Sequence, residues 1–239
     1  MTARTGSSGA RLAAGLAAVL LAGAATNVAE AQGTQTARTP AGTRAVTKPV
    51  TPAAPAAPRS FVVAPEGNEA RYRVRERLMN RELDNDAIGA TRGVTGTLIV
   101  DARGRVVRDG SRIVVDLRGL KSDSERRDGF LQRRTLQTDS FPTVTLVPTA
   151  IRGGTGALPT SGTATFELLA DLTVRGVTRP TVWTVTARSD GGVVTGTAAT
   201  AFTFKDFGLD QPRVPVVLSV ADTIKLEYDF RFVPAQQTR

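Results

Sequence analysis

Two residue types are missing from this chain, and each absence closes a route to chemistry. None of its 239 residues is a cysteine, which excludes disulfide bonds, thiol catalysis and a lipid-modified cysteine. None is a histidine, the side chain that most often acts as a general base near neutral pH and as a metal ligand. We therefore expect a protein that is not an enzyme and holds neither a metal nor a cofactor. Catalysis through carboxylates or through the neighbouring Lys121 and Ser122 is the alternative.

Long apolar runs are also scarce, and the clearest one lies near the N-terminus. It extends from Leu12 to Ala25 behind two arginines and is shorter than the ~20 residues that span a bilayer. Ala29-Glu30-Ala31 then places small residues on both sides of one spacer, as at a signal-peptide cleavage site. The pattern predicts a signal peptide at residues 1–31, no stable membrane insertion and a periplasmic or secreted mature protein. An uncleaved anchor is the alternative.

The net charge of +9 does not indicate a nucleic-acid-binding protein. Residues 1–60 carry six basic residues and one acidic residue, which leaves 25 basic and 21 acidic residues for the rest of the chain. Such a nearly balanced and interspersed set is typical of an ordinary solvated surface. Residues 32–60 are rich in Thr, Ala and Pro, with prolines spaced so that neither helix nor sheet can persist, and this composition predicts a disordered linker.

Apolar residues at alternate positions predict antiparallel β-strands through most of residues 61–234. Two such runs lie between Phe166 and Ala187, joined by a turn at Gly176, and Pro180 restarts the extended chain. The last run alternates Ile224 to Phe232 with charged residues. Similar runs give about eight antiparallel strands, the pattern of an all-β barrel or sandwich, between which composition cannot choose.

An early strand combines an apolar face with a row of arginines. Tyr72 and Val74 lie on one face, and four arginines at 71, 73, 75 and 77 lie on the other. The arginines either solvate the outside of a sheet, which we favour, or form a binding strip. Glu76 shares the phase of the apolar residues, so it points inward and needs a partner or a polar head group.

One short helix is predicted between the early and the central strands. Ser122 and Glu125 have the spacing of a capping box, which places the start of the helix at Ser122. The predicted buried side consists of Leu120, Phe130, Leu131 and Leu136, and the predicted solvated side consists of Arg126, Arg127, Arg133 and Arg134.

Several motifs, in order along the chain, resemble those of the YceI-like family. The longest is the hairpin Leu172-Thr173-Val174-Arg175-Gly176-Val177-Thr178-Arg179-Pro180, similar to the family's LT-(I/V)-(K/R)-GVT-(K/R)-P. Arg127-Asp128 with Leu131, the stretch from Phe141 to Leu146, the stretch from Phe204 to Gly208 and the stretch from Asp222 to Leu226 resemble further family segments. The resemblance implies an all-β, lipocalin-like antiparallel barrel of about eight strands, with one short inserted α-helix, over residues 61–234.

The same resemblance implies a function, because the family comprises secreted bacterial proteins that bind polyisoprenoids and other lipids inside the barrel. The expected partner is an isoprenoid, an isoprenoid quinone or another long-chain lipid, and a homodimer is left open. The chain departs from the family in its first strand, which usually carries a serine and a histidine around an aromatic residue but here reads Ala70-Arg71-Tyr72-Arg73-Val74. Lipid binding is therefore inferred from the barrel rather than from a matching head-group site.

The candidate ligand-binding residues are those expected to point into the barrel. They are Tyr72, Val74, Glu76, Leu98, Val115, Phe166, Leu168, Ala170, Leu172, Trp183, Val185, Phe202, Phe204, Tyr228 and Phe230. Few aromatics and small residues such as Gly96, Ala170 and Ala198 favour a hollow barrel, with Tyr72, Glu76 or Tyr228 at a polar head group. The alternative is a filled barrel, which would be a periplasmic stress or interaction protein without a lipid ligand.

Overall fold

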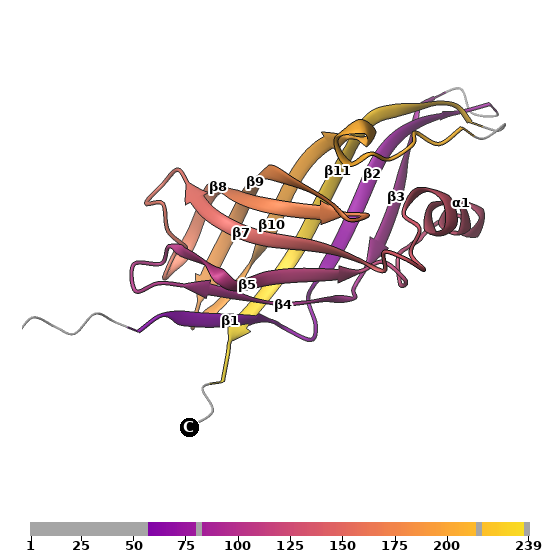
Figure 1. The fold of residues 1–239 in the computed structure, drawn as a ribbon. Helices are drawn as coiled ribbons and strands as arrows, with labels where there is room; N and C mark the ends of the chain where they lie inside the picture. The colour runs from indigo at the N-terminus through magenta and orange to yellow at the C-terminus, as the bar shows by residue number, and fades with distance from the viewer. Residues whose placement is uncertain (1–56, 80–82, 214–216, 237–239) are drawn as a thin grey trace, which may run out of the picture. The chain divides into compact units, whose positions relative to one another are not determined.

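Eight antiparallel strands close into a barrel in the computed structural model, which describes residues 57–79, 83–213 and 217–236 (Figure 1). In order around the barrel they are β1 (Arg59–Val63), β4 (Val94–Val100), β5 (Val106–Asp116), β7 (Thr143–Arg152), β8 (Gly162–Val174), β9 (Val177–Asp190), β10 (Val193–Thr203) and β11 (Val217–Pro234). Pairing of β1 with β11 closes the barrel. The prediction of an all-β, lipocalin-like barrel is confirmed.

Three further strands extend the sheet beyond the closed barrel. The N-terminal part of β11 pairs with β2 (Glu69–Leu78), which pairs with β3 (Asn85–Thr91), which pairs with the two-residue β6 (Lys121–Ser122). In Figure 1, β11, β2 and β3 run alongside one another, with α1 next to β3. The 18-residue β11 thus belongs to both parts, because its C-terminal residues pair with β1 and its preceding residues pair with β2.

The inserted helix is present but begins two residues later than predicted. Helix α1 covers Glu125–Phe130, and its N-cap is Ser124, whose hydroxyl accepts a hydrogen bond from the Arg127 backbone N–H. Ser122 instead donates its hydroxyl to Asp128 Oδ1 at 2.6 Å. A π-helical turn, η1 (Leu131–Thr135), continues α1, and a 3₁₀ turn, η2 (Phe204–Phe207), follows β10. The predicted solvation of Arg127 is also wrong, because only 19% of its side chain is exposed, next to Glu76.

The first strand of the barrel was missed by the analysis of alternation. β1 begins at Arg59, so the last two residues of the predicted linker pair with Ile99 and Val100 of β4. Its inward side chain is Phe61, which is 3% exposed. Phe61-Val62-Val63 is a short apolar run without alternation, so a period of two does not predict this strand. The predicted signal peptide and the linker up to residue 56 lie outside the described residues.

Arg71, Arg73 and Arg75 of β2 form ion pairs on the outside of the sheet, mostly with neighbouring strands. Arg71 contacts Glu69 at 2.9 Å and Asp229 at 2.7 Å, and the hydrogen bond that it donates to Asp229 is the largest effect raising the Arg71 pKa. Arg73 contacts Asp86 of β3 at 3.1 Å and Glu227 of β11 at 3.4 Å. This arrangement fits the favoured interpretation, in which the arginines solvate the sheet. No helix in the part of the chain that the structure describes has the length and apolarity of a membrane span.

Candidate functional site

A cavity of ≈150 Å³ lies inside the barrel at the end next to α1, and its lining is almost entirely apolar. Strands β2, β3, β5 and β7 to β11 supply its walls. The segment around α1 and η1 supplies Leu120, Leu131, Thr135 and Leu136, and the segment around η2 supplies Phe204 and Leu209. We call the residues from these two segments the roof of the cavity. An apolar cavity of this kind has no polar partners to hold water, so it suits the hydrocarbon part of a ligand.

The fifteen predicted site residues divide between this cavity and the rest of the interior. Eight line the cavity, namely Tyr72, Val74, Val115, Leu172, Trp183, Phe202, Phe204 and Tyr228. Six others belong to the hydrophobic interior outside the cavity lining, namely Leu98, Phe166, Leu168, Ala170, Val185 and Phe230. Glu76 is buried away from the cavity in an ion pair. Burial of the roof residues Leu120, Leu131 and Leu136 is predicted from the sequence, but their place in the site is not, and Thr135 is not singled out at all.

On each strand that supplies residues of both groups, the cavity-lining residues lie toward the α1 end of the barrel and the other interior residues lie toward the opposite end. The barrel is therefore hollow at one end and filled at the other. On β8 the cavity is lined by Leu172 and Val174, whereas Phe166 and Ala170 lie outside it. On β9 it is lined by Trp183 but not by Val185 or Ala187, and on β11 by Ile224, Leu226 and Tyr228 but not by Phe230 or Phe232. The hollow and the filled interpretations of the sequence therefore each describe one half of the barrel.

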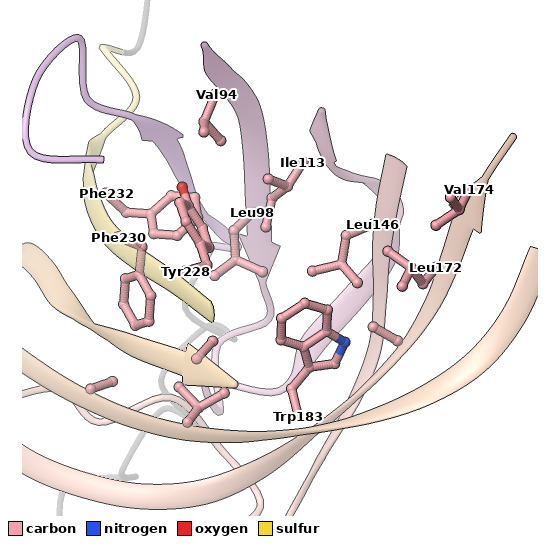
Figure 2. Close-up of a cluster of buried hydrophobic side chains, with 14 of the residues drawn as sticks. Val94, Leu98, Ile113, Leu146, Leu172, Val174, Trp183, Tyr228, Phe230 and Phe232 are labelled. Carbon is pink, nitrogen blue, oxygen red and sulfur yellow. The ribbon is translucent and has the colours of Figure 1, made fainter. Parts of the chain in front are cut away.

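Aromatic rings close the filled end. The ring centroids of Tyr228 and Phe230 are 5.8 Å apart and those of Phe230 and Phe232 are 5.7 Å apart, typical spacings for packed rings. Figure 2 shows the three rings extending from one strand into the interior near Leu98. A small residue here makes room for a ring, since a Cβ added at Gly196 would lie 2.7 Å from Phe230 Cζ. Small residues in these strands are therefore not evidence of empty space.

Tyr228 lies at the boundary between the two halves, and a buried polar network fixes its position. Its hydroxyl donates to Asn68 Oδ1 at 2.9 Å, and the same oxygen accepts the Arg231 backbone N–H at 2.9 Å. Asn68 Nδ2 in turn donates to the Ala64 carbonyl oxygen at 2.7 Å. Burial raises the pKa of Tyr228, so the phenol stays neutral. Asn68 was not predicted from the sequence. The one relevant signal there is that a buried tyrosine needs a hydrogen-bond partner for its hydroxyl.

Trp183, the single tryptophan of the chain, lies in the cavity wall and is 4% exposed. Its indole Nε1–H donates to Thr181 Oγ1 at 2.9 Å, and the Thr181 hydroxyl donates to the Ala170 carbonyl oxygen at 2.9 Å. Figure 2 shows the ring pointing toward Leu146 of β7, which lies on the other side of β8 from β9. Because the one polar atom of the indole is satisfied within the sheet, its ring presents an apolar surface to the cavity.

A polar cluster lies between β2 and α1, beside the cavity. Glu76 accepts hydrogen bonds from Arg127 Nη2 at 2.8 Å and from Asn85 Nδ2 at 3.2 Å, which supplies the partner that its inward position requires. Ser122 accepts from Arg127 Nη1 at 3.3 Å and from its own neighbour Ser124 N at 3.2 Å while donating to Asp128. The Ser122 hydroxyl is therefore held between Asp128 and Arg127.

The Tyr72 side chain separates this polar cluster from the cavity. Its ring lies against the backbone of Gly89, where an added Cβ would be 2.3 Å from Tyr72 Cε1. Within the described residues, its hydroxyl is the one buried side-chain nitrogen or oxygen that lacks a hydrogen-bond partner. Burial raises the Tyr72 pKa to about 12. No group of three or more acidic side chains placed to hold a metal ion occurs in the described ranges, which lack cysteine and histidine altogether.

Comparison with known proteins agrees with this geometry. The fold is similar to a polyisoprenoid binding domain from Saccharophagus degradans implicated in plant cell wall breakdown, with 9% identity, a TM-score of 0.52, and coverage of 74% of this chain and 99% of that one. It is also similar to Burkholderia cenocepacia BcnA, with 15% identity, a TM-score of 0.53, and coverage of 71% and 98%. A Campylobacter jejuni YceI protein matches with 14% identity, a TM-score of 0.50, and coverage of 67% and 91%.

No curated protein matches the chain in sequence. The family model of the YceI-like domain, however, matches residues 61–232, which is nearly the whole barrel and the added strands. The match covers the hairpin, the helical segment and the final strand on which the resemblance in sequence rests. The chain belongs to the YceI-like family.

Proposed function

We propose that this protein binds the apolar part of an isoprenoid lipid or isoprenoid quinone in the barrel and so sequesters or carries it. The observation that carries the proposal is the apolar cavity at the α1 end of the barrel. Hydrocarbon that enters such a cavity gains roughly 25 cal/mol per Å² of apolar surface removed from water, before the cost of ordering the chain. The printed description of the Saccharophagus degradans domain as polyisoprenoid-binding supports the same class of ligand.

The size of the cavity indicates how a long chain would enter. At ≈150 Å³ it is smaller than the roughly 300–1,000 Å³ of typical ligand pockets, so a long lipid needs the roof to move. Helix α1 is the part of this segment suited to movement, because it buries none of its side chains, whereas the roof residues Leu120 and Thr135 are buried. Polar contacts, such as those of Arg127 with Glu76 and of Arg175 Nη1 with the Thr135 carbonyl oxygen at 3.2 Å, hold this segment.

We further propose that the protein acts by binding rather than by catalysis, after export to the periplasm or the medium. The support for export is the signal-peptide pattern at residues 1–31. N-terminal sequencing of the exported protein should give Gln32 as the first residue. Recovery of the full chain from the membrane fraction, with Met1 intact, would show an uncleaved anchor instead.

The binding proposal is tested on the full exported protein. Native mass spectrometry should detect an adduct of a few hundred daltons that is released into organic solvent and has the mass of an isoprenoid or quinone. Titration of delipidated protein with farnesol should change the emission of Trp183, because that indole lines the cavity. Absence of both an extractable lipid and a spectral response would favour the alternative function, a stress or interaction protein that works through its surface.

A further inference from the structure

We infer that Tyr228 is the stop that sets how many carbon atoms of a ligand chain the barrel accepts. The inference rests on the proposed function and adds to it a limit on the chain and the direction in which the chain enters. Tyr228 lines the cavity, and the next two inward residues on the same strand, Phe230 and Phe232, do not. A chain that moves away from α1 along the barrel therefore meets the Tyr228 ring before it meets the packed aromatic residues.

The stop is rigid, in contrast to helix α1. The Tyr228 hydroxyl is bound to Asn68, whose amide is itself fully engaged with the backbone of Ala64 and Arg231. Ala64 and Arg231 are themselves joined by a backbone hydrogen bond of 2.8 Å, next to the residues through which β1 and β11 pair. A buried polar network in which each member is satisfied holds its side chains in one position. The ring of Tyr228 is therefore not free to rotate out of the path of a ligand.

The same network determines which end of a ligand goes in first. Because the Tyr228 hydroxyl donates its hydrogen bond to Asn68, it has no spare donor for a ligand oxygen at the floor of the cavity, the end formed by Tyr228. Trp183 likewise donates its N–H to Thr181. A polar head group at the floor would lose its hydrogen bonds to water without replacement, at a cost that hydrocarbon does not incur. The ligand class that fits is a lipid with an unsubstituted hydrocarbon end, which enters tail first and keeps its head toward α1.

Phe230 offers a matched control for Tyr228. The two rings lie two residues apart on the same face of β11, are equally buried at 7% exposure and pack against each other. They differ in that Tyr228 borders the cavity and Phe230 does not. Loss of either ring removes a similar volume from the interior, but the structure connects only the Tyr228 space to the cavity. Asn68 Oδ1 keeps its bond from the Arg231 N–H when Tyr228 is replaced, so that amide is not left without a partner.

The experiment measures affinity against chain length for the delipidated full-length protein. The probes are straight-chain primary alcohols from 1-octanol upward in steps of two carbons, titrated by calorimetry. For the wild type, each added methylene should tighten binding about fourfold until the chain reaches Tyr228, after which affinity should level off. In Tyr228→Ala the levelling should move to chains longer by about two carbons or more, because a space opens beside the cavity. In Phe230→Ala it should stay where it is in the wild type.

Each outcome decides one question. If no alcohol binds the wild type, the proposed function fails. If alcohols bind and the levelling point is the same in all three proteins, or moves equally in both variants, binding stands and Tyr228 is not the stop. If either alanine variant does not fold by circular dichroism, Tyr228→Leu and Phe230→Leu replace them, with probes in one-carbon steps. A shift of about one carbon in Tyr228→Leu alone would support the stop, and no difference between the two leucine variants would overturn it.

Discussion

Glu76 and Arg127 form a buried ion pair whose two members have different further support. The Glu76 side chain is 7% exposed, and its other hydrogen bond comes from Asn85. Arg127 is 19% exposed and also contacts Asp123 and Ser122. Removal of one partner therefore leaves the carboxylate much less compensated than the guanidinium. In physical terms, the cost of breaking this pair depends on which charge is left behind.

This asymmetry gives a testable prediction. Arg127→Leu should lower the free energy of unfolding by about 3 kcal/mol, the low end of the range for a buried pair, because Arg127 keeps some contact with water. Glu76→Leu should cost less than half as much, because Asp123 and Ser122 still compensate the guanidinium. Urea denaturation of both variants and of the double variant measures the difference. Equal losses in the two single variants would contradict this account.

The lack of histidine and cysteine leads to a second prediction at the scale of single residues, which concerns the dependence of stability on pH. With neither histidine nor cysteine, the chain has no side chain that ordinarily titrates between about pH 5.5 and 8. Several carboxylates have lowered pKa values, as in Glu69 through its hydrogen bond from Arg71 and in Asp86 through that from Arg73. Their stabilisation is present above the unfolded pKa values of 4.5 and 3.8, and is lost as pH falls through the lower folded values.

The melting temperature should therefore be level from about pH 5.5 to pH 8 and should fall progressively below about pH 4.5. Differential scanning calorimetry across this range, at constant ionic strength, measures the profile. Arg71→Gln should weaken the acid-side fall, because the pKa of Glu69 is then less depressed. A melting temperature that rises on acidification below pH 4.5 would show that the sign is wrong.

Strand β10 packs so closely against β9 that one of its positions accepts only glycine. A Cβ at Gly196 would lie 2.0 Å from the Thr186 carbonyl oxygen of β9 and 2.7 Å from Phe230 Cζ of β11. Gly196→Ala should therefore lower the free energy of unfolding by about 1–3 kcal/mol or more, measured by urea denaturation. Gly119→Ala is the control, since the nearest atom to its Cβ would be Thr91 Oγ1 at 3.4 Å. A control as unstable as Gly196→Ala would rule out the steric explanation.

At the scale of the element, alternation along a strand predicts which face a residue occupies but not whether that residue borders the cavity. Alternation predicted correctly that Trp183, Tyr228 and Phe230 point inward, because a period of two assigns each residue to a face. It could not predict that Phe230 lies outside the cavity while Tyr228 borders it. That difference depends on the register, which places Gly196 opposite Phe230 and so gives its ring room. Register is a property of two strands together and cannot be derived from one strand alone.

At the scale of the whole molecule, the barrel begins with β1, whose first residues lie inside the stretch that its composition predicts to be a linker. β1 pairs on one side with β4 and on the other with β11, so the barrel is not closed without it. A mature protein that lacks residues 32–56 should melt within a few degrees of the intact one, since that composition cannot bury a core. A protein that also lacks residues 57–63 should lose most of its stability. Thermal melts of the two truncations test this, and similar melting temperatures would contradict it.

Closure of the barrel also has a consequence for the time course of folding. Phe61, near the start of the domain, pairs with Pro234, near its end, so the closing contact has almost the largest sequence separation that the domain allows. Contacts between residues so far apart in sequence form slowly, and β11 is the last strand of the barrel to be synthesised. Until it emerges, β1, β2 and β10 each expose a free edge that can pair with other chains. A nonsense mutation before residue 217 should therefore give an aggregating product rather than a smaller barrel, and a nascent chain needs protection of these edges until β11 has paired.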